Sequence, residues 1–321
     1  MIDSQLPMET PVTIGFLLLP QFSQLGFSAA LEPLRLANMQ SGRTLYRWVV
    51  LSPDGSPVFS SSNMSSVADR SMTDLEGLDV LLVCASYHAE QATSPSVVTV
   101  VRRAERIGIA IGSIETGTYA LAKAGVLNGY QATVHWEEIE TLTEQYPRIV
   151  VKRDLFVIDR NRYTAAGATA ALDMMLHLIA ADHGDLFANQ IAEAFTITQR
   201  RHGETPQRMT VERRFQGGSR RLSKAVERME ATLEDPVPLD DIATSAGVSL
   251  RELERLFKRW LHTTPNAYYR ELRLLRARSL LQSTALPVTE IAVTCGFSSP
   301  AHFSRCFRTR FRRSPSEERG R

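Results

Sequence analysis

The stretch Leu239-Asp-Asp-Ile-Ala-Thr-Ser-Ala-Gly-Val-Ser249 occurs a second time in this chain of 321 residues, as Val288-Thr-Glu-Ile-Ala-Val-Thr-Cys-Gly-Phe-Ser298. Identical residues recur 49 positions later: Ile242, Ala243, Gly247 and Ser249. Three more recur 50 positions later: Arg255, Phe257 and Pro265. The second copy therefore has one additional residue in its turn, and the repeat indicates two similar structural units in succession.

Each copy has the pattern of a helix-turn-helix. A short helical segment ends at a glycine that can adopt positive φ, and a serine then caps a second helix. In the first copy the predicted inward stripe is Leu250, Leu253, Phe257 and Trp260, and the outward stripe is Arg251, Glu254, Arg255 and Lys258. In the second copy Phe303, Phe307 and Phe311 are predicted inward, with His302, Arg305 and Arg308 or Thr309 outward.

The charge of the chain is unevenly distributed. Residues 219–321 contain 19 Lys and Arg residues against 12 Asp and Glu residues, a net charge of +7, and residues 1–218 carry the balance of −5. A basic C-terminal third on an acidic body suggests that this third contacts a polyanion.

Length and composition are those of an ordinary globular protein. A chain of 321 residues favours two domains, and its apolar runs are shorter than the ~18 residues of a membrane span. Without a secretory signal pattern, we expect a cytoplasmic protein with no membrane partner. The cysteines Cys84, Cys295 and Cys306 are too few and scattered for a disulfide framework or zinc site, and nothing indicates a metal or cofactor.

The first half alternates short apolar runs with helical patterns. Strands are predicted at Val12–Leu19, Trp48–Leu51, Val80–Cys84, Ile107–Ile111, Val150–Val151, Phe156–Ile158 and Tyr163–Ala165. Helices are predicted at Gly26–Met39, Pro95–Arg106, Thr116–Ala124, Trp136–Tyr146, Ala168–Ala181 and Leu186–Gln199. This alternation favours a parallel sheet with helices on both faces.

A polar segment without periodicity separates this half from the repeat. It contains Gly203, Pro206, Gly217 and Gly218, which is typical of a linker. We therefore predict an α/β domain of residues 10–200, a linker of residues 201–218 and an all-α domain of residues 219–318.

The repeat resembles the signature of a known family. The stretch Gly296-Phe-Ser-Ser-Pro-Ala-His-Phe-Ser-Arg-Cys-Phe-Arg-Thr-Arg-Phe-Arg-Arg-Ser-Pro315 is similar to that of the AraC/XylS transcription regulators. The helical pattern of Pro265–Gln282 lies where that family has the helix joining its two units. The resemblance covers residues 219–318 and implies double-stranded DNA and RNA polymerase as partners.

In that family the second helix of each unit enters the major groove of DNA. The resemblance assigns base contacts to Arg251, Glu254, Arg255, Pro300, Ala301, His302, Ser304 and Arg305. Arginine can donate two hydrogen bonds to guanine, whereas Glu254 can accept from cytosine or pair with Arg251 or Lys258. Pro300 and Ala301 offer only apolar or backbone contacts, so we expect the second unit to discriminate bases less.

The first half resembles the PfpI/ThiJ branch of the class I glutamine amidotransferase-like, flavodoxin-like α/β fold. The resemblance lies in Ile111-Gly-Ser-Ile-Glu-Thr-Gly-Thr-Tyr-Ala-Leu-Ala-Lys-Ala-Gly-Val-Leu-Asn-Gly129 and Ala132-Thr-Val-His-Trp136. The two halves together resemble the GlxA-like regulators. Enzymes of this fold carry a cysteine nucleophile on a sharp strand-to-helix turn. The matching residue here is Glu115, so we expect no enzyme activity.

The resemblance also outlines a pocket beside that turn. Glu32 matches the acid that leans on the turn, and His135 matches the family histidine. Two carboxylates in one cleft repel each other and attract a cation, and Trp136 can supply an aromatic face for a quaternary ammonium. Alternatives stay open: Trp136 can belong to the core, Glu32 can pair with Arg35, His135 can support the site from behind, and Cys84 and His88 can line it.

The sequence therefore predicts a DNA-binding transcription regulator that senses a small amine. Some GlxA-like regulators sense betaine, carnitine or arginine, and the resemblance makes such cationic or zwitterionic metabolites candidates here. The family favours an activator and a homodimer formed through the N-terminal domain. A hydrolase or amidase with a DNA-binding tail is the alternative function, and an N-terminal domain that only dimerises is a third.

Overall fold

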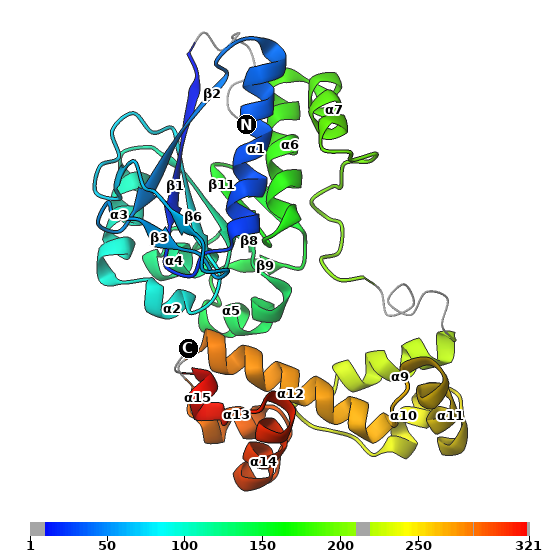
Figure 1. The fold of residues 1–321 in the computed structure, drawn as a ribbon. Coiled ribbons are helices and arrows are strands. Elements are labelled where there is room, and N and C mark those ends of the chain that lie inside the picture. Colours follow the sequence, from blue (N-terminus) through cyan, green and yellow to red (C-terminus); the bar gives the residue numbers. More distant parts are fainter. Residues whose placement is uncertain (1–9, 210–218, 285, 320–321) are drawn as a thin grey trace. The chain divides into compact units, whose positions relative to one another are not determined.

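A computed structural model describes residues 10–209, 219–284 and 286–319 of the chain. The chain divides into two compact units, residues 1–207 and 208–321 (Figure 1).

The first unit contains a seven-stranded sheet in the order β10-β11-β7-β6-β1-β2-β5. Its strands are β1 (Val12–Leu18), β2 (Tyr46–Ser52), β5 (Arg70–Ser71), β6 (Val80–Ala85), β7 (Ala110–Glu115), β10 (Phe156–Asp159) and β11 (Arg162–Ala165). Neighbouring strands are parallel except β10 and β11, which pair antiparallel. The prediction of a parallel sheet is therefore wrong at this edge, because the short connection between β10 and β11 permits only a hairpin.

Helices cover both faces of this sheet (Figure 1). On one face lie α1 (Gln24–Ser41), α6 (Thr169–His183) and α7 (Asp185–Ala194), and on the other lie α3 (Pro95–Arg106) and α4 (Thr118–Ala124). Phe16 and Leu18 of β1 pack on the α1 side, while Leu17 and Leu19 pack on the α3 side. Because successive side chains of a strand point to opposite faces, two covered faces require the continuous apolar run seen in the sequence.

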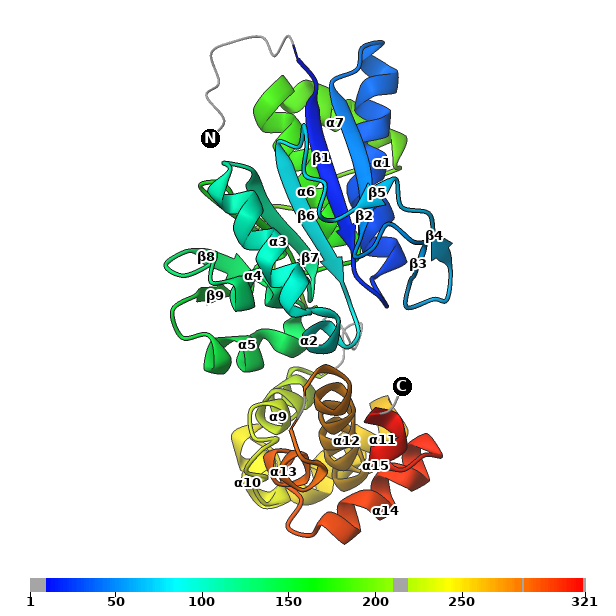
Figure 2. The ribbon, with the colours of Figure 1, turned by 90° about the vertical axis from the view of Figure 1, so that its left-hand side faces the viewer.

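Smaller elements surround the sheet. The hairpin of β3 (Val58–Phe59) and β4 (Ser65–Ser66) lies beyond the β5 edge (Figure 2). The remaining elements are α2 (Ala89–Ala92), β8 (Gln131–Thr133), the 3₁₀ helix η1 (Trp136–Glu138), α5 (Ile139–Gln145) and β9 (Val150–Lys152), where β8 and β9 pair in parallel.

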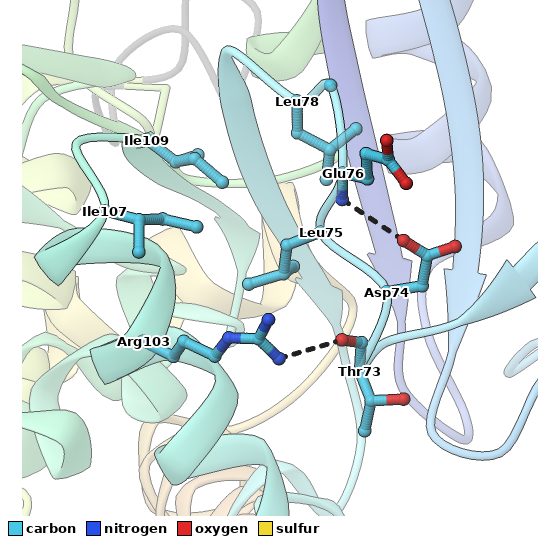
Figure 3. A pocket seen from close by; sticks show the side chains of 9 residues that line it. Thr73, Asp74, Leu75, Glu76, Leu78, Arg103, Ile107 and Ile109 are labelled. Atoms are coloured by element: carbon cyan, nitrogen blue, oxygen red, sulfur yellow. Dashed lines mark hydrogen bonds between the residues drawn. The ribbon is translucent and has the colours of Figure 1, made fainter.

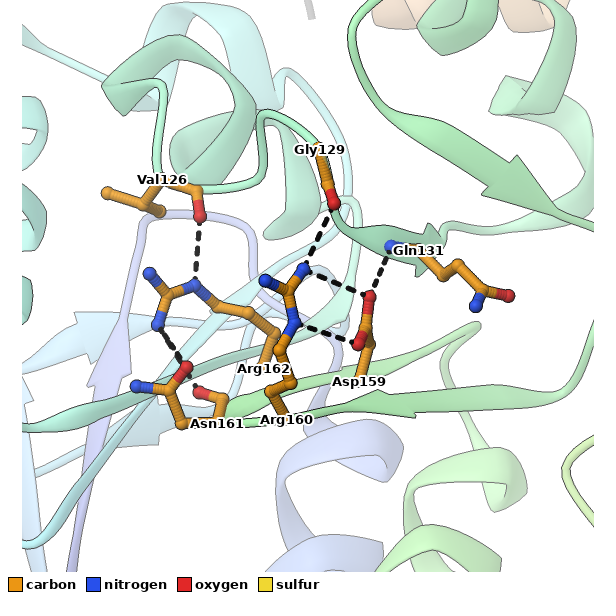
Figure 4. A network of polar contacts seen from close by, with 7 residues as sticks. All are labelled: Val126, Gly129, Gln131, Asp159, Arg160, Asn161 and Arg162. Carbon is orange, nitrogen blue, oxygen red and sulfur yellow. Dashed lines mark hydrogen bonds and ion pairs between the residues drawn. The ribbon is translucent and has the colours of Figure 1, made fainter.

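A polar network fixes the β10–β11 hairpin (Figure 4). The buried guanidinium of Arg162 donates from Nε to the carbonyl oxygen of Val126 at 2.8 Å and forms an ion pair with Glu105. At the turn, the carboxylate of Asp159 accepts from the backbone N–H of Gln131 at 2.8 Å. A buried charge needs such partners, and here they tie the hairpin to β8 and to the segment after α4.

Part of the predicted linker contacts the first unit. The backbone N–H of Leu155 donates to the carbonyl oxygen of Gly203 at 2.8 Å. The side-chain amide of Gln207 donates to the carbonyl oxygen of Asp154 at 2.8 Å. Residues 210–218 of the predicted linker lie outside the described residues.

The second unit is helical throughout its described part. Its helices are α9 (Arg220–Glu230), α10 (Leu239–Ser245), α11 (Leu250–Leu261), α12 (Pro265–Ser283), α13 (Val288–Thr294), α14 (Pro300–Phe311) and α15 (Pro315–Arg319). One apolar cluster joins α9, α10 and α11 to Tyr269 of α12, and another joins α13 and α14 to Leu274 and Leu280 of the same helix. The long helix α12 thus belongs to both cores.

One residue of the predicted inward stripe is misplaced. Trp260 is 39% exposed, whereas Leu253, Leu256 and Phe257 are the buried residues of α11. The buried face continues to Leu261, which packs against the first cluster, so Trp260 falls on the open side of the last turn. In the described part of the chain, no helix is both long and apolar enough to cross a membrane.

Candidate functional site

The first repeated segment folds into the helix-turn-helix formed by α10 and α11. Gly247 has a φ of +68°, a conformation that favours glycine. The hydroxyl of Ser249 caps α11 by accepting from the backbone N–H of Glu252 at 3.2 Å. Both features agree with the turn predicted from the sequence.

The second repeated segment forms the equivalent pair, α13 and α14, with one difference. Gly296 again has a positive φ, +71°. The cap of α14, however, is Ser299, whose hydroxyl accepts from the backbone N–H of His302 at 3.3 Å. Ser298, which aligns with the first capping serine, is exposed. The additional residue of this turn moves the cap by one position and places Pro300 in the first turn of α14.

The outward stripe of α11 is solvent-exposed as predicted. Its exposed residues are Arg251, Glu254, Arg255 and Lys258. These four side chains, with Ser249 and Glu252, line one shallow hollow of about 400 Å³. The side chains of α11 that the family resemblance assigns to base contact therefore share one surface.

Glu252 is a member of this surface that the sequence analysis did not identify. Its carboxylate accepts from Nε and Nη2 of Arg255, both at 2.8 Å, and these hydrogen bonds hold the pKa of Glu252 below its usual range. In the described structure Glu254 forms no ion pair with Arg251 or Lys258. The ion pair of α11 thus involves a different carboxylate from the one considered in the sequence.

The corresponding face of α14 carries fewer charges. Pro300, Ala301, His302 and Arg305 are exposed, and Ser304 is half-buried. The imidazole Nε2 of His302 lies 3.3 Å from Sγ of Cys306. All five residues predicted to contact bases from the second unit therefore lie on α14, with a single guanidinium among them.

In the first unit, Glu115 lies on a strained strand-to-helix turn. It ends β7 with a φ of +61°, which is unusual for a residue with a side chain. Two residues later, a Cβ on Gly117 would lie 2.1 Å from the carbonyl oxygen of Val83, so only glycine fits there. The turn then leads directly into α4, in the geometry that this fold uses to present a nucleophile.

The side chain of Glu115 is partly buried and held in place. The hydroxyl of Ser86 donates to Oε1 at 2.6 Å, and the side chain of Ser23, which caps α1, also lowers the pKa of this carboxyl. A Cβ on Gly167 would lie 2.8 Å from Cγ of Glu115, so this glycine makes room for the carboxylate. Burial raises the pKa of Glu115, the two serines lower it, and the charge of Glu137 raises it again.

The structure does not bring Glu32 to this turn. The start of α1, at Ser23 and Gly26, lies against β7, and Glu32 lies about two helical turns further along. Its carboxylate pairs with Arg35 of the same helix at 2.7 Å. Glu32 is not among the groups that act on the carboxyl of Glu115, so the structure gives the predicted pair no support. The carboxylate that does act on Glu115 is Glu137 of η1, which sequence reasoning missed.

His135 and Trp136 lie at the start of η1. Nδ1 of His135 is 3.8 Å from Oε2 of Glu137, and burial lowers the pKa of this histidine. The rings of His135 and Trp136 are 5.4 Å apart, and Trp136 is partly buried against the core on the α3 side. His135 therefore lies beside Glu137, the carboxylate that acts on Glu115, while the indole of Trp136 is in part a core residue.

Two further predicted candidates occupy other roles. Cys84 is fully buried, and burial together with the charge of Glu115 raises the pKa of its thiol. It cannot line an open pocket. His88 has a φ of +57° and precedes α2, two residues after Ser86. Among the described residues, no group of three or more His, Cys, Asp or Glu side chains could hold a metal ion.

A separate hollow of about 400 Å³ lies at the amino ends of β6 and β7, opposite the end of the sheet that carries Glu115 (Figure 3). It is lined by the 73–78 loop before β6, and by Arg103, Ile107 and Ile109 before β7. Arg103 donates from Nη1 to the carbonyl oxygen of Thr73 at 3.1 Å, so its charge is partly used within the loop. Ligands of open α/β sheets bind at the carboxyl ends of the strands, where Glu115 lies.

Comparison with known proteins gives matches to both units. The sequence matches the DJ-1/PfpI family over residues 12–181 and a helix-turn-helix domain family over residues 242–321. It is 41% identical to the HTH-type transcriptional regulator GbdR of Pseudomonas aeruginosa, over 97% of this chain and 85% of that protein. It is 38% identical to the HTH-type transcriptional regulator GlxA of Rhizobium meliloti, over 96% of this chain and 95% of that protein.

A solved structure agrees with these matches. The crystal structure of an AraC family transcriptional regulator from Pseudomonas putida is 29% identical, with a TM-score of 0.53, and covers 58% of this chain and 100% of that chain. The named relatives are transcriptional regulators, which agrees with the interpretation of this protein as a regulator rather than an enzyme. The chain belongs to the GlxA-like AraC-family transcriptional regulators, which join a DJ-1/PfpI-type α/β domain to an AraC-type helix-turn-helix domain.

Proposed function

We propose that this regulator senses a small cationic or zwitterionic amine at Glu115 and answers by changing how α11 and α14 engage DNA. The observation that carries the proposal is the carboxylate at the one turn which this fold aims at its ligand site. Enzymes of this fold use a thiol there, and the carboxylate of Glu115 is a poor nucleophile for acyl chemistry.

The electrostatics of the site favour a cation. Burial and the neighbouring Glu137 both disfavour the charged form of Glu115, so a bound cation relieves a repulsion that exists in the empty site. The lowered pKa of His135 keeps its imidazole neutral near pH 7, so it adds no competing positive charge. The hydroxyl of Ser86 orients the carboxylate without neutralising it.

On DNA, we place α11 and α14 in successive major grooves, about 34 Å apart along one face of the duplex. The candidate base contacts are Arg251, Glu254 and Arg255 in α11, and Pro300, Ala301, His302, Ser304 and Arg305 in α14. A homodimer formed through the N-terminal α/β unit would present two pairs of these helices to a repeated operator. An activator would also contact RNA polymerase. Nuclease footprinting of the full chain checks this geometry, since protection of a single groove per protomer contradicts it.

The ligand site is tested with Glu115→Gln, which keeps the shape of the side chain and removes its charge. Glycine betaine, carnitine and arginine are first screened by thermal shift, and the amine with the largest shift is titrated by calorimetry. We expect Glu115→Gln to weaken its binding tenfold or more, because truncating one partner of a buried charge pair costs about 2–5 kcal/mol. Glu193→Gln, an exposed glutamate of α7, is the matched control.

Two companion variants separate the possible carboxylate pairs. Glu137→Gln should weaken the amine as well, whereas Glu32→Gln should not, because the carboxylate of Glu32 is engaged with Arg35. Unchanged affinity in Glu115→Gln, or an effector that proves anionic, contradicts the electrostatic argument. The DNA affinity of these variants without amine should equal that of the unmodified protein.

The same site predicts the pH dependence of binding. The raised pKa of Glu115 means that part of the empty protein carries a neutral carboxyl at mildly acidic pH, and a cation prefers the charged form. The affinity for glycine betaine, whose ammonium charge is permanent, should therefore increase as pH rises through this pKa. Calorimetry across this range should show proton release on binding, and Glu115→Gln should remove both effects.

A further inference from the structure

We infer that Glu252 is a positioning residue which orients Arg255 for reading a base in the major groove. The inference rests on the proposed role of α11 in DNA recognition. It concerns a residue that belongs to neither the family resemblance nor the outward stripe read from the sequence.

The hydrogen bonds between the two side chains use one edge of the guanidinium. Nε and Nη2 of Arg255 donate to the two oxygens of Glu252, in the bidentate arrangement that a planar guanidinium and a carboxylate favour. Nη1 and the second N–H of Nη2 remain available at the far end of the fork. These are the donors that can form paired hydrogen bonds with O6 and N7 of one guanine. The ion pair therefore leaves the base-reading end of Arg255 free while fixing its direction.

The position of Glu252 makes this pairing informative. With Ser249 as the cap, Glu252 stands at the third residue of α11, where a glutamate normally bonds back to the backbone N–H of the capping serine. The C-terminal compact unit shows that backbone bond at α15, where the carboxylate of Glu317 accepts from the backbone N–H of Ser314 at 2.6 Å. In α11 both oxygens of the glutamate bond Arg255 instead. The side chain is thus directed away from capping and toward the arginine.

The second helix-turn-helix, formed by α13 and α14, has no such arrangement. Its equivalent of Glu252, three residues before Arg305, is His302, which lies against Cys306. In the described structure no carboxylate pairs with Arg305. The positioning of an arginine by a carboxylate is therefore specific to the first unit and does not follow from the repeat.

The exposure of the two side chains fits this role. The side chain of Arg255 is 66% exposed and that of Glu252 is 28% exposed, so the arginine extends outward from a more enclosed carboxylate. An exposed ion pair contributes little to folding, because water screens it and both side chains lose freedom. Inside a groove that excludes water, a guanidinium already fixed in direction loses less freedom when it bonds a base.

The test uses the full chain and a duplex selected by the unmodified protein from a randomised double-stranded library. Every base pair of this duplex is then replaced singly, and Arg255→Ala identifies the base pair that Arg255 reads. We expect Glu252→Gln to reduce discrimination at that same base pair by about tenfold, which is the lower range for a bidentate base contact. Affinity for unrelated duplexes should stay the same or rise, because a negative charge has been removed.

Glu227→Gln, which removes an exposed negative charge from α9, is the matched control and should leave discrimination unchanged. Thermal unfolding of each variant separates positioning from folding. A uniform loss of affinity for all duplexes with a lower unfolding temperature would make Glu252 merely structural and overturn the inference. Retained discrimination, or tighter binding of the selected duplex by Glu252→Gln, would also overturn it, because Glu252 would then be idle or a competitor for Arg255. If Arg255→Ala alters the preference at no base pair, the inference falls together with the proposed base contact of Arg255.

Discussion

The two helix-turn-helix units share a sequence pattern, yet their turns have different surroundings. At Gly247, φ is +68° and a Cβ would meet open space. At Gly296, φ is +71°, but a Cβ would lie 2.3 Å from Cγ of Pro236 and 2.7 Å from the carbonyl oxygen of Leu233. The first glycine is required by backbone conformation alone, and the second also by the close approach of the segment that follows α9.

The second turn is also tied to α12. Nη1 of Arg273 donates to the carbonyl oxygen of Gly296 at 3.0 Å, and its guanidinium lies 4.8 Å from the ring centre of Phe297. The turn of the second helix-turn-helix therefore packs against both α12 and the segment that follows α9. The comparison teaches that a repeated motif specifies the backbone path of both copies, whereas the roles of equivalent residues depend on what packs against them.

The largest expected effect separates these two glycines. Gly296→Ala should lower the free energy of unfolding by about 2–5 kcal/mol, the sum of positive-φ strain and overpacking against fixed backbone. Gly247→Ala should lower it by only about 1–2 kcal/mol, because the added methyl meets nothing. Urea unfolding of both full-length variants measures the difference, and equal losses would show that the segment at Pro236 moves away without resistance.

The proposed recognition helices, α11 and α14, differ as much as the turns. In α11, Arg255 is held by Glu252, and three other charged side chains share its surface. In α14, the positions equivalent to Arg251 and Glu254 are Ala301 and Ser304, so Arg305 shares its face with one other charged side chain, the exposed Arg308. We therefore expect the first helix-turn-helix unit to supply most of the base discrimination. Arg305, the arginine among the candidate base contacts of α14, should discriminate bases less and contribute in part through the adjoining phosphate.

Exchange of each arginine for lysine sharpens this difference. Arg255→Lys should cost about 1–3 kcal/mol of affinity for the selected duplex, because an ammonium cannot bond Glu252 and a guanine in two parallel pairs. Arg305→Lys should cost less than about 1 kcal/mol, because a lysine keeps the charge that a phosphate contact needs. Binding titrations at fixed salt measure both changes. Equal losses, confined to one base pair each, would remove the proposed asymmetry.

The backbone of both helix-turn-helix motifs and of the α/β domain could be predicted from local sequence. The apolar run at β1 predicts a strand covered on both faces, and the glycines predict both turns, because these features depend on neighbouring residues. The exposed stripe of α11 followed from helical periodicity for the same reason. The buried clusters of the second unit agree with the predicted inward phenylalanines Phe257, Phe303 and Phe307.

The side-chain partners could not be predicted in the same way. Glu32 was assigned to the pocket from a motif match, but α1 approaches β7 at Ser23, so the helix carries Glu32 away from Glu115. Glu137 belongs to η1, which is separated from Glu115 in the sequence by α4 and β8, so its effect on Glu115 depends on the tertiary structure. The pairing of Glu252 with Arg255 is local, but it depends on a choice of rotamer that a pattern of residue types does not contain.

The smallest expected effect concerns the serines of the two turns, where the alignment of the repeat and the structure disagree. The alignment equates Ser298 with the capping Ser249, whereas the structure gives the cap of α14 to Ser299. Ser249→Ala and Ser299→Ala should each lower the free energy of unfolding by about 1 kcal/mol, the usual contribution of an N-cap hydroxyl. Ser298→Ala, at an exposed position, should change it by less than about 0.5 kcal/mol. Urea unfolding of the three variants decides between the two assignments, since a loss at Ser298 with none at Ser299 would show that the second turn closes like the first and that the additional residue lies inside α14.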